Sequence, residues 1–305
     1  MRHILESQQF DIQLIDKLFK RADEFRVLLD RKDPSLSKVL DGEMMFTIFY
    51  EPSTRTRMSF SAAAQHLGMK VVTTENARDF SSAVKGETLE DSIRVMCQYQ
   101  PSLIVLRHHE DGAANKAAGV STVPIINAGD GTGQHPTQAL LDLYTINKEL
   151  GKLDGLNIVI GGDLAHGRTA RSLAYLLAKY PKNKITFVAP EVLKIDDDIK
   201  SYLTRHKISF QETENIREAL PRADVVYWTR VQKERFDSTK LKGGFNIGVE
   251  EMKLLPKKSV LLHPLPRIDE ISIEVDKDPR AAYFRQAGNG MFIRMALIEW
   301  ALKTA

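Results

Sequence analysis

The chain has 305 residues, of which 43% are hydrophobic and 27% charged, a composition that is typical of soluble globular proteins and excludes disordered and fibrous classes. Its formal net charge is +3, and both signs are interspersed along the chain, so neither nucleic acid nor a membrane surface is an expected partner. No apolar run approaches the roughly 20 residues of a spanning helix. The first residues also lack the apolar stretch of a signal peptide, which predicts a cytoplasmic protein.

Strand-like and helical patterns alternate along the first half of the chain. The predicted strands are 45–50, 71–73, 103–106 and 123–126, and the predicted helices are 11–29, 54–67, 88–99 and 136–150. The alternation then restarts with strands at 157–160, 185–188, 208–211, 225–228 and 260–262 and helices at 169–179, 197–205 and 291–303. The predicted fold class is therefore α/β, with two doubly wound parallel-sheet domains joined by helices.

The first informative segment runs from Phe49 to Arg57, where a strand ends and a helix begins. The free N–H groups of a helix N-terminus attract an anion, and hydroxyls and a guanidinium add further donors. Ser53, Thr54 and Thr56 supply hydroxyls, and Arg55 supplies the guanidinium. This combination favours a phosphate over a simple helix cap.

A second segment, 129–138, also follows a strand and opens a helix at Pro136. Its glycines would let the backbone approach a ligand. His135 and Gln138 are three residues apart around the first turn, so both can face that ligand and offer polar contacts to a carbonyl and an amide.

The third segment, 161–169, is again a strand, a glycine turn and a helix. The dinucleotide fingerprint fails here because Asp163 stands where its second glycine is required. Gly162 and Gly167 have the spacing of a P-loop, but Arg168 replaces the lysine of that motif, so an NTPase is a weak alternative. The segment keeps the features of an anion-binding helix start that carries Arg168.

Two more segments follow predicted strands. Arg230 and Gln232 fall on one side of an extended chain and suit a carboxylate. Farther on, Pro264 and Pro266 lack N–H groups, which leaves backbone carbonyls available to accept from an NH₂ group.

The sequence does not favour disulfides, metal sites or other common catalytic motifs. The single Cys97 excludes an internal disulfide and a cysteine-based zinc site, and its apolar neighbours indicate a buried structural thiol. The sequence contains no G-x-S-x-G, H-E-x-x-H or EF-hand pattern. His108 and His109 are adjacent and lack a matching ligand cluster, so no metal site is predicted.

At these residues the chain resembles the aspartate/ornithine carbamoyltransferase family over essentially its whole length. The segment FxxxSTRT resembles the family's carbamoyl-phosphate signature, whereas HPTQ, TRVQKERF and HPLP resemble its aspartate branch. Ornithine-type members typically carry HPCQ and HCLP instead. The resemblance implies a carbamoyl-phosphate domain at 1–150, an aspartate domain at 151–287, and a C-terminal helix, 288–305, that packs back on the first domain.

The resemblance also implies residue roles. Carbamoyl phosphate would be held by Ser53, Thr54, Arg55, Thr56, Arg107, His135, Gln138, Pro264 and Leu265. Of these, Arg55, Thr56 and His135 would polarise the carbamoyl carbonyl, while Gln138 and the carbonyls at 264 and 265 would orient its NH₂. Aspartate would be held by Arg168, Arg230, Gln232 and Lys85. Lys85 would also be catalytic, and Glu51 would pair with Arg168 and Arg235.

In this family Ser81 and Lys85 reach a neighbouring subunit's site, which implies a catalytic homotrimer. The implied activity is transfer of the carbamoyl group of carbamoyl phosphate to L-aspartate in pyrimidine biosynthesis, with no cofactor. A zinc-bearing regulatory chain is a partner in part of the family. Strongly cooperative members commonly carry Glu-Tyr after the KERF segment, where this chain has Ser238, Thr239 and Lys240, so the resemblance does not extend to allosteric switching.

Two alternatives remain beside this reading. One is a carbamoyltransferase for ornithine or another amino acid, which the cationic pocket of Arg168 and Arg230 disfavours because it would repel a cationic side chain. The other is a non-catalytic phosphate-binding or scaffold subunit. Such a subunit would be expected to have lost several ligand residues, and here each expected position is filled.

Overall fold

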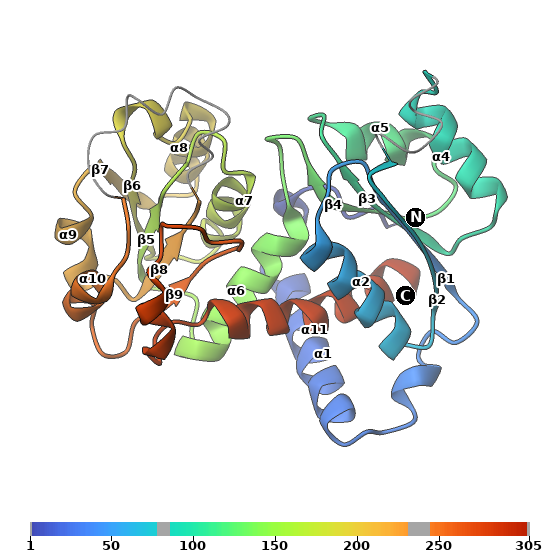
Figure 1. The fold of residues 1–305 in the computed structure, drawn as a ribbon, viewed down its shortest axis with the longest axis horizontal. Coiled ribbons are helices and arrows are strands. Elements are labelled where there is room, and N and C mark those ends of the chain that lie inside the picture. The colour runs from blue at the N-terminus through green and yellow to red at the C-terminus, as the bar shows by residue number, and fades with distance from the viewer. Residues whose placement is uncertain (1, 78–85, 231–244, 304–305) are drawn as a thin grey trace. The chain divides into compact units, whose positions relative to one another are not determined.

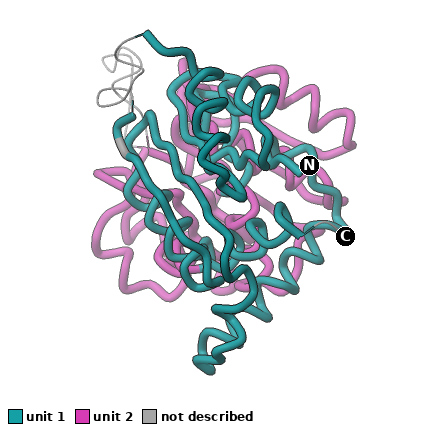
Figure 2. The backbone as a smooth tube through the Cα atoms, turned by 90° about the vertical axis from the view of Figure 1, so that its right-hand side faces the viewer, with its two compact units in different colours: residues 1–137, 289–305 teal, residues 138–288 magenta. Residues whose placement is uncertain are grey.

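The structure is a computed structural model that describes residues 2–77, 86–230 and 245–303. It divides into two compact units, the first formed by 1–137 and 289–305 and the second by 138–288 (Figure 2). Each unit is built on one parallel sheet, which confirms the predicted fold class. No helix in the described ranges is long and apolar enough to cross a membrane.

The sheet of the first unit has the strand order β2-β1-β3-β4 (Figure 1). Its strands are β1 (Met44–Phe49), β2 (Lys70–Glu75), β3 (Leu103–His108) and β4 (Ile125–Asp130). The chain passes from β1 outward to β2 and then back across to β3, so the strand order reverses between β1 and β3. Ligands of open parallel sheets bind outside the carboxyl ends of the strands at such a reversal.

Helices cover both faces of this sheet. Cys97 on α4 and Ala117 on α5 pack with Ile48 and Ile104 in one apolar cluster. On α11, Glu299 accepts two hydrogen bonds from Arg21 of α1, at 2.6 and 2.9 Å, and Arg294 donates to the hydroxyl of Ser59 on α2 at 2.8 Å. The helices of this unit are α1 (Ile12–Asp30), α2 (Thr54–His66), α4 (Leu89–Gln98), α5 (Ala113–Val120), the first residues of α6 (Pro136–Leu150) and the end of α11 (Tyr283–Leu302), with short 3₁₀ turns η1 (Ser7–Gln9) and η2 (Leu36–Lys38).

The second unit has the strand order β7-β6-β5-β8-β9, and its reversal lies between β5 and β8. Its strands are β5 (Asn157–Gly161), β6 (Lys184–Val188), β7 (Ser209–Thr213), β8 (Val225–Trp228) and β9 (Val260–Leu262). Val226 and Trp228 pack with Leu220 and Met252 on one face of the sheet. The helices are α7 (Arg168–Leu177), α8 (Asp197–Arg205), α9 (Ile216–Ala219) and α10 (Val249–Leu254), with 3₁₀ turns η4 (Glu191–Leu193), η5 (Leu220–Arg222) and η8 (Ile273–Lys277).

The structure differs from the predicted elements most clearly in three short helices, in β4 and in α11. α5, α9 and α10 were not predicted, because short helices carry little periodic signal. β4 continues to Asp130, so the first residues of the predicted glycine turn belong to the strand. α11 begins at Tyr283 and not at 291, because buried packing of Tyr283 and Gln286 outweighs the poor helix propensity of the Gly-Asn-Gly run that follows.

Candidate functional site

The N-terminus of α2 gathers polar side chains that the described structure leaves without partners. Ser53 is the N-cap residue but makes no capping hydrogen bond, and the first turn contains no acidic residue. Within the described part of the chain, no hydrogen bond or ion pair engages the side chains of Ser53, Thr54, Arg55 or Thr56. Partial burial lowers the pKa of Arg55, because desolvation disfavours the charged guanidinium.

Two other helices of the same unit, α1 and α4, have side-chain caps at their N-termini. Asp11 caps α1 by accepting from the backbone N–H of Leu14 at 2.7 Å. Thr88 caps α4 by accepting from Asp91 at 3.1 Å, and Glu90 and Asp91 add negative charge to the first turn of that helix. The first N–H groups of a helix have no intrahelical acceptor. At α2 the same turn also carries hydroxyls and a guanidinium, which together with the N–H groups form a donor set complementary to an anion.

Arg107 lies on β3, beside the end of β1, and therefore on the other side of the strand reversal from this helix start. Its guanidinium is almost buried and donates to the carbonyl of Ala128 at 3.2 Å and to Oε1 of Glu51 at 2.9 Å. The pairing of Glu51 with Arg168 and Arg235 stays a prediction. Its ion pair with Arg107 holds the guanidinium at the carboxyl edge of the sheet.

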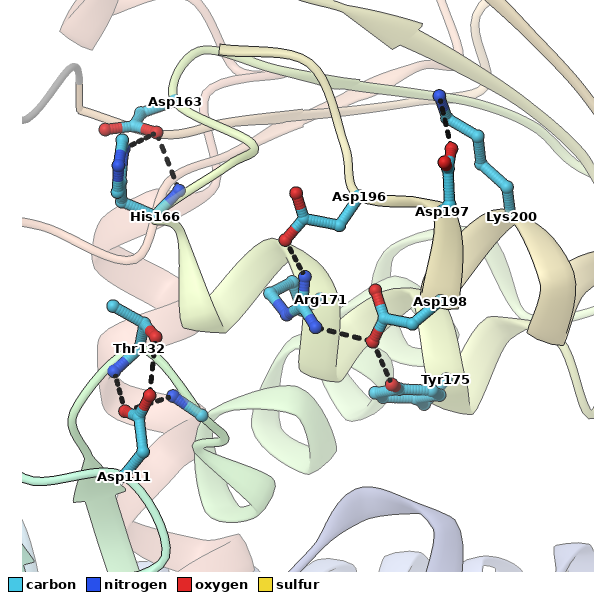
Figure 3. Close-up of polar contacts among 11 residues, drawn as sticks. Asp111, Thr132, Asp163, His166, Arg171, Tyr175, Asp196, Asp197, Asp198 and Lys200 are labelled. Carbon is cyan, nitrogen blue, oxygen red and sulfur yellow. Dashed lines mark hydrogen bonds and ion pairs between the residues drawn. The ribbon is translucent and has the colours of Figure 1, made fainter.

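The carboxylate of Asp111 fixes the loop between β4 and α6. Asp111 accepts from the backbone N–H groups of Thr132 at 2.5 Å and Gly133 at 3.2 Å, and from the Thr132 hydroxyl at 3.0 Å (Figure 3). Gly131 has φ +47°, and a Cβ at this position would lie 1.8 Å from Oδ1 of Asp111. The glycine is therefore required for the close approach of Asp111. The loop delivers His135, which is buried, to the start of α6.

In the second unit, a turn at the carboxyl end of β5 leads to Arg168, the first residue of α7. A Cβ on Gly161 would lie 2.1 Å from the ring of Trp228, so the glycine permits close packing with β8. Asp163 is fully buried, and its Oδ1 accepts from the backbone N–H of His166 at 2.9 Å and lies 3.1 Å from the Nδ1 atom of that histidine (Figure 3). These contacts between Asp163 and His166 thus stabilise the turn that precedes Arg168.

A second arginine on α7, Arg171, forms ion pairs with two aspartates. Arg171 donates to Asp196 and to Asp198, each at 2.6 Å, and Tyr175 donates to the same oxygen of Asp198 at 3.1 Å (Figure 3). Burial and the neighbouring Asp198 raise the pKa of Tyr175 to about 12. This cluster ties α7 to the start of α8.

Arg230 follows β8, on the opposite side of the second strand reversal from Arg168. The backbone N–H of Thr229 donates to the carbonyl of Gly161 at 2.8 Å, and its hydroxyl donates to the same oxygen at 3.1 Å. Arg168 and Arg230 therefore follow neighbouring strands at the same edge of one sheet. Three predicted residues, Ser81, Lys85 and Gln232, lie outside the described residues, as does Arg235.

The loop after β9 is organised around His263, which is buried. Its Nδ1 accepts from the backbone N–H of Leu265 at 2.8 Å, so the proton lies on Nε2, which is 2.8 Å from Oε1 of Glu270. Burial by itself would raise the pKa of Glu270, but hydrogen bonds from His263 and from backbone N–H groups outweigh it and lower that pKa. The carbonyls of Pro264 and Leu265 accept no hydrogen bond from the described part of the chain.

The adjacent histidines have structural contacts. His108 is buried, its Nδ1 accepts from the backbone N–H of Glu110 at 3.0 Å, and its ring stacks on His109 at 4.3 Å. Burial, with a smaller contribution from His109, lowers the pKa of His108 to about 4. Among the described residues, no group of three His, Cys, Asp or Glu side chains has a metal-binding arrangement.

Sequence analysis missed the buried residues that support this site. Asp142 lies four positions after Gln138 on α6 and accepts a hydrogen bond from its side chain at 2.7 Å. That spacing is a readable signal, because residues four apart share a helix face. Gln286 and Glu270 could not be found this way, because each meets its partner only through the tertiary fold.

Comparisons with known proteins agree with this geometry. Residues 2–148 match the family described as aspartate/ornithine carbamoyltransferase, carbamoyl-P binding domain, and residues 154–301 match its Asp/Orn binding domain. An aspartate carbamoyltransferase from Oryza sativa, described as chloroplastic, is 53% identical over 98% of this chain and 84% of its own length.

Two solved structures are similar along nearly the whole chain. The catalytic subunit of M. jannaschii aspartate transcarbamoylase has a TM-score of 0.90 and 44% identity, covering 99% of this chain and 98% of its own. Aspartate transcarbamoylase from Trypanosoma cruzi, solved with carbamoyl aspartate and phosphate, has a TM-score of 0.91 and 39% identity, covering 99% and 96%. The resemblance seen in the motifs is confirmed, and the chain belongs to the aspartate/ornithine carbamoyltransferase family.

Proposed function

We propose that this protein transfers the carbamoyl group of carbamoyl phosphate to the amine of L-aspartate, giving N-carbamoyl-L-aspartate and phosphate in pyrimidine biosynthesis. The observation that carries the proposal is the start of α2, where Ser53, Thr54, Arg55 and Thr56 offer side chains unpartnered within the described structure, at a strand reversal. Relatives named aspartate carbamoyltransferase at up to 53% identity support the same reaction.

The phosphate group would lie against the N-terminus of α2. Backbone N–H groups and hydroxyls there would donate to its oxygens, while Arg55 and Arg107 would balance its charge. The ion pair of Arg107 with Glu51 supports this role, since it fixes the arginine before any ligand arrives. The first unit is thus the proposed carbamoyl-phosphate domain.

The carbamoyl carbonyl would accept hydrogen bonds from Arg55, Thr56 and His135. These donors become most important when the amine of aspartate attacks the carbamoyl carbon, because negative charge then develops on that oxygen. The new C–N bond forms, the bond from carbon to the phosphate oxygen breaks, and the departing phosphate takes up a proton from the amine. Catalysis rests on positioning and electrostatics, with Lys85 as a further proposed cation and no cofactor.

The carbamoyl NH₂ requires acceptors. Gln138 offers its side-chain oxygen, and the carbonyls of Pro264 and Leu265 remain available within the described structure. All three belong to the second unit. This acceptor set would distinguish a carbamoyl group from an acyl group that lacks the NH₂.

The two carboxylates of aspartate would be bound by Arg168, Arg230, Gln232 and Lys85. Arg168 and Arg230 follow β5 and β8, the two strands that flank the reversal of the second sheet. A pair of guanidinium groups suits a dicarboxylic amino acid and disfavours the cationic side chain of ornithine. The second unit is thus the proposed aspartate domain.

The proposed assembly is a homotrimer in which Ser81 and Lys85 complete a neighbouring subunit's site. Mixing two inactive variants, Arg55→Ala and Lys85→Ala, after dissociation tests it. Random trimers would regain about a quarter of wild-type sites, since each mixed trimer has one intact site. No recovery of activity above that of the separate variants would reject shared sites.

A zinc-bearing regulatory chain and a cytoplasmic location remain predictions, and several plant relatives are named as chloroplastic.

The reaction itself is tested by phosphate release from carbamoyl phosphate with L-aspartate or L-ornithine at matched concentrations. We expect turnover that depends on aspartate. Turnover with ornithine would overturn the carboxylate pocket, and turnover with neither would favour a binding or scaffold protein.

A further inference from the structure

Asp142 on α6 is a fully buried carboxylate that the proposed reaction does not use directly. Its Oδ1 accepts from the side-chain NH₂ of Gln138 at 2.7 Å and from the side-chain NH₂ of Gln286, on α11, at 2.6 Å. The Oε1 atom of Gln286 accepts from the backbone N–H of His263 at 2.9 Å. All four residues belong to the second unit, and Figure 1 shows the two helices that carry the three side chains.

These hydrogen bonds form a relay from Gln138 through Asp142 and Gln286 to His263. The backbone N–H of His263 fixes the direction of each bond in it. A backbone N–H can only donate, so the oxygen of Gln286 must face His263 and its NH₂ must face Asp142. Oδ1 of Asp142 then serves as an acceptor, and Gln138 can bond to it only through its own NH₂. The oxygen of Gln138 is therefore directed away from the carboxylate.

We propose that Asp142 is a positioning residue that holds the Gln138 amide with its oxygen toward the substrate, so that the site recognises a carbamoyl group by its NH₂. This inference rests on the proposed function, in which Gln138 contacts the carbamoyl group. Without Asp142, the Gln138 amide can turn over and present its NH₂ to the substrate NH₂, a contact between two donors.

The same relay reaches the second group of NH₂ acceptors. His263 begins the loop that carries the carbonyls of Pro264 and Leu265, and its own ring accepts from the N–H of Leu265. Gln286 thus joins the two proposed contacts of the carbamoyl NH₂, one from α6 and one from the loop after β9. A buried hydrogen-bond network of this kind favours one arrangement of its members.

The test compares carbamoyl phosphate with acetyl phosphate, which carries a methyl group in place of the NH₂. The dissociation constants of both for the full-length protein are measured by calorimetry. In Asp142→Ala we expect carbamoyl phosphate to bind about 10-fold more weakly, while acetyl phosphate changes by less than about 2-fold. General damage to the site would weaken both ligands equally, so the ratio of the two constants separates positioning from structure.

Further variants make the test specific. Gln138→Ala should lose the same discrimination, and adding Asp142→Ala to it should change the ratio no further, because Asp142 acts through Gln138. Asp142→Asn keeps an oxygen for both donors and should retain most of the ratio. The control is Thr145→Val, which removes a buried hydroxyl from the same helix, where it donates to the carbonyl of Leu141, and should leave the ratio unchanged.

The outcomes separate the two proposals. Wild-type protein that neither binds nor turns over carbamoyl phosphate would reject the proposed function. Wild-type protein that does both, with full discrimination retained in Asp142→Ala or in Gln138→Ala, would overturn the role of Asp142. If Asp142→Ala fails to fold, Gln138→Ala still decides whether the amide carries the discrimination.

Discussion

His108 should make the stability of this protein sensitive to mild acid. It ends β3, is 5% exposed, and packs its ring 4.7 Å from that of Tyr50. Burial holds its pKa at about 4, against the ordinary pKa of 6.5 for an exposed histidine. Between these values the unfolded chain binds a proton at this position that the folded chain does not, so the free energy of unfolding falls as the pH falls.

The size of the effect follows from the two pKa values. At pH 5 this histidine is about 97% protonated in the unfolded chain and about 9% protonated in the folded one. The corresponding loss of stability between pH 7 and pH 5 is about 2 kcal/mol. It should be absent in His108→Gln, whose side chain is neutral throughout and keeps an acceptor for the backbone N–H of Glu110.

Urea unfolding followed by circular dichroism, at one protein concentration, gives the free energy of unfolding of both proteins at pH 7 and pH 5. The wild type should lose about 2 kcal/mol more than the variant over this range. The comparison cancels the other titrating groups, which both proteins share. A difference below about 0.5 kcal/mol would refute the assignment of a buried, neutral His108.

Three further predictions concern the candidate site. Arg55→Ala should lower kcat/KM for carbamoyl phosphate by about 100- to 1000-fold, since it removes a donor to the developing oxyanion. Arg222→Ala, at an exposed position, is the control, and equal activity of the two variants would contradict the role of Arg55. Arg230→Ala should raise KM for aspartate steeply while KM for carbamoyl phosphate changes little, and unchanged aspartate kinetics would remove Arg230 from the site. Gly131→Ala should lower Tm in calorimetry, at a cost of order 1–3 kcal/mol, because its Cβ would overlap the Asp111 carboxylate; an unchanged Tm would show that the loop does not need the glycine.

Much of the organisation could be predicted from the sequence because its signals are local. Apolar strands that alternate with amphipathic helices predicted the two parallel sheets, and the polar run from Ser53 to Thr56 predicted an anion site at a helix start. Motif resemblance then separated the aspartate branch from the ornithine branch. Each of these inferences depends on residues within one or two turns of one another.

The tertiary structure decided which internal partners the polar residues have. Local sequence does not show that Arg171 on α7 meets two carboxylates at the start of the next helix, which the fold brings to it. Nor does the sequence show that Asp142 meets Gln286, 144 positions away. Local patterns determine secondary structure because their interactions are short in sequence, whereas hydrogen-bond partners of buried side chains are chosen by chain segments that only folding brings together.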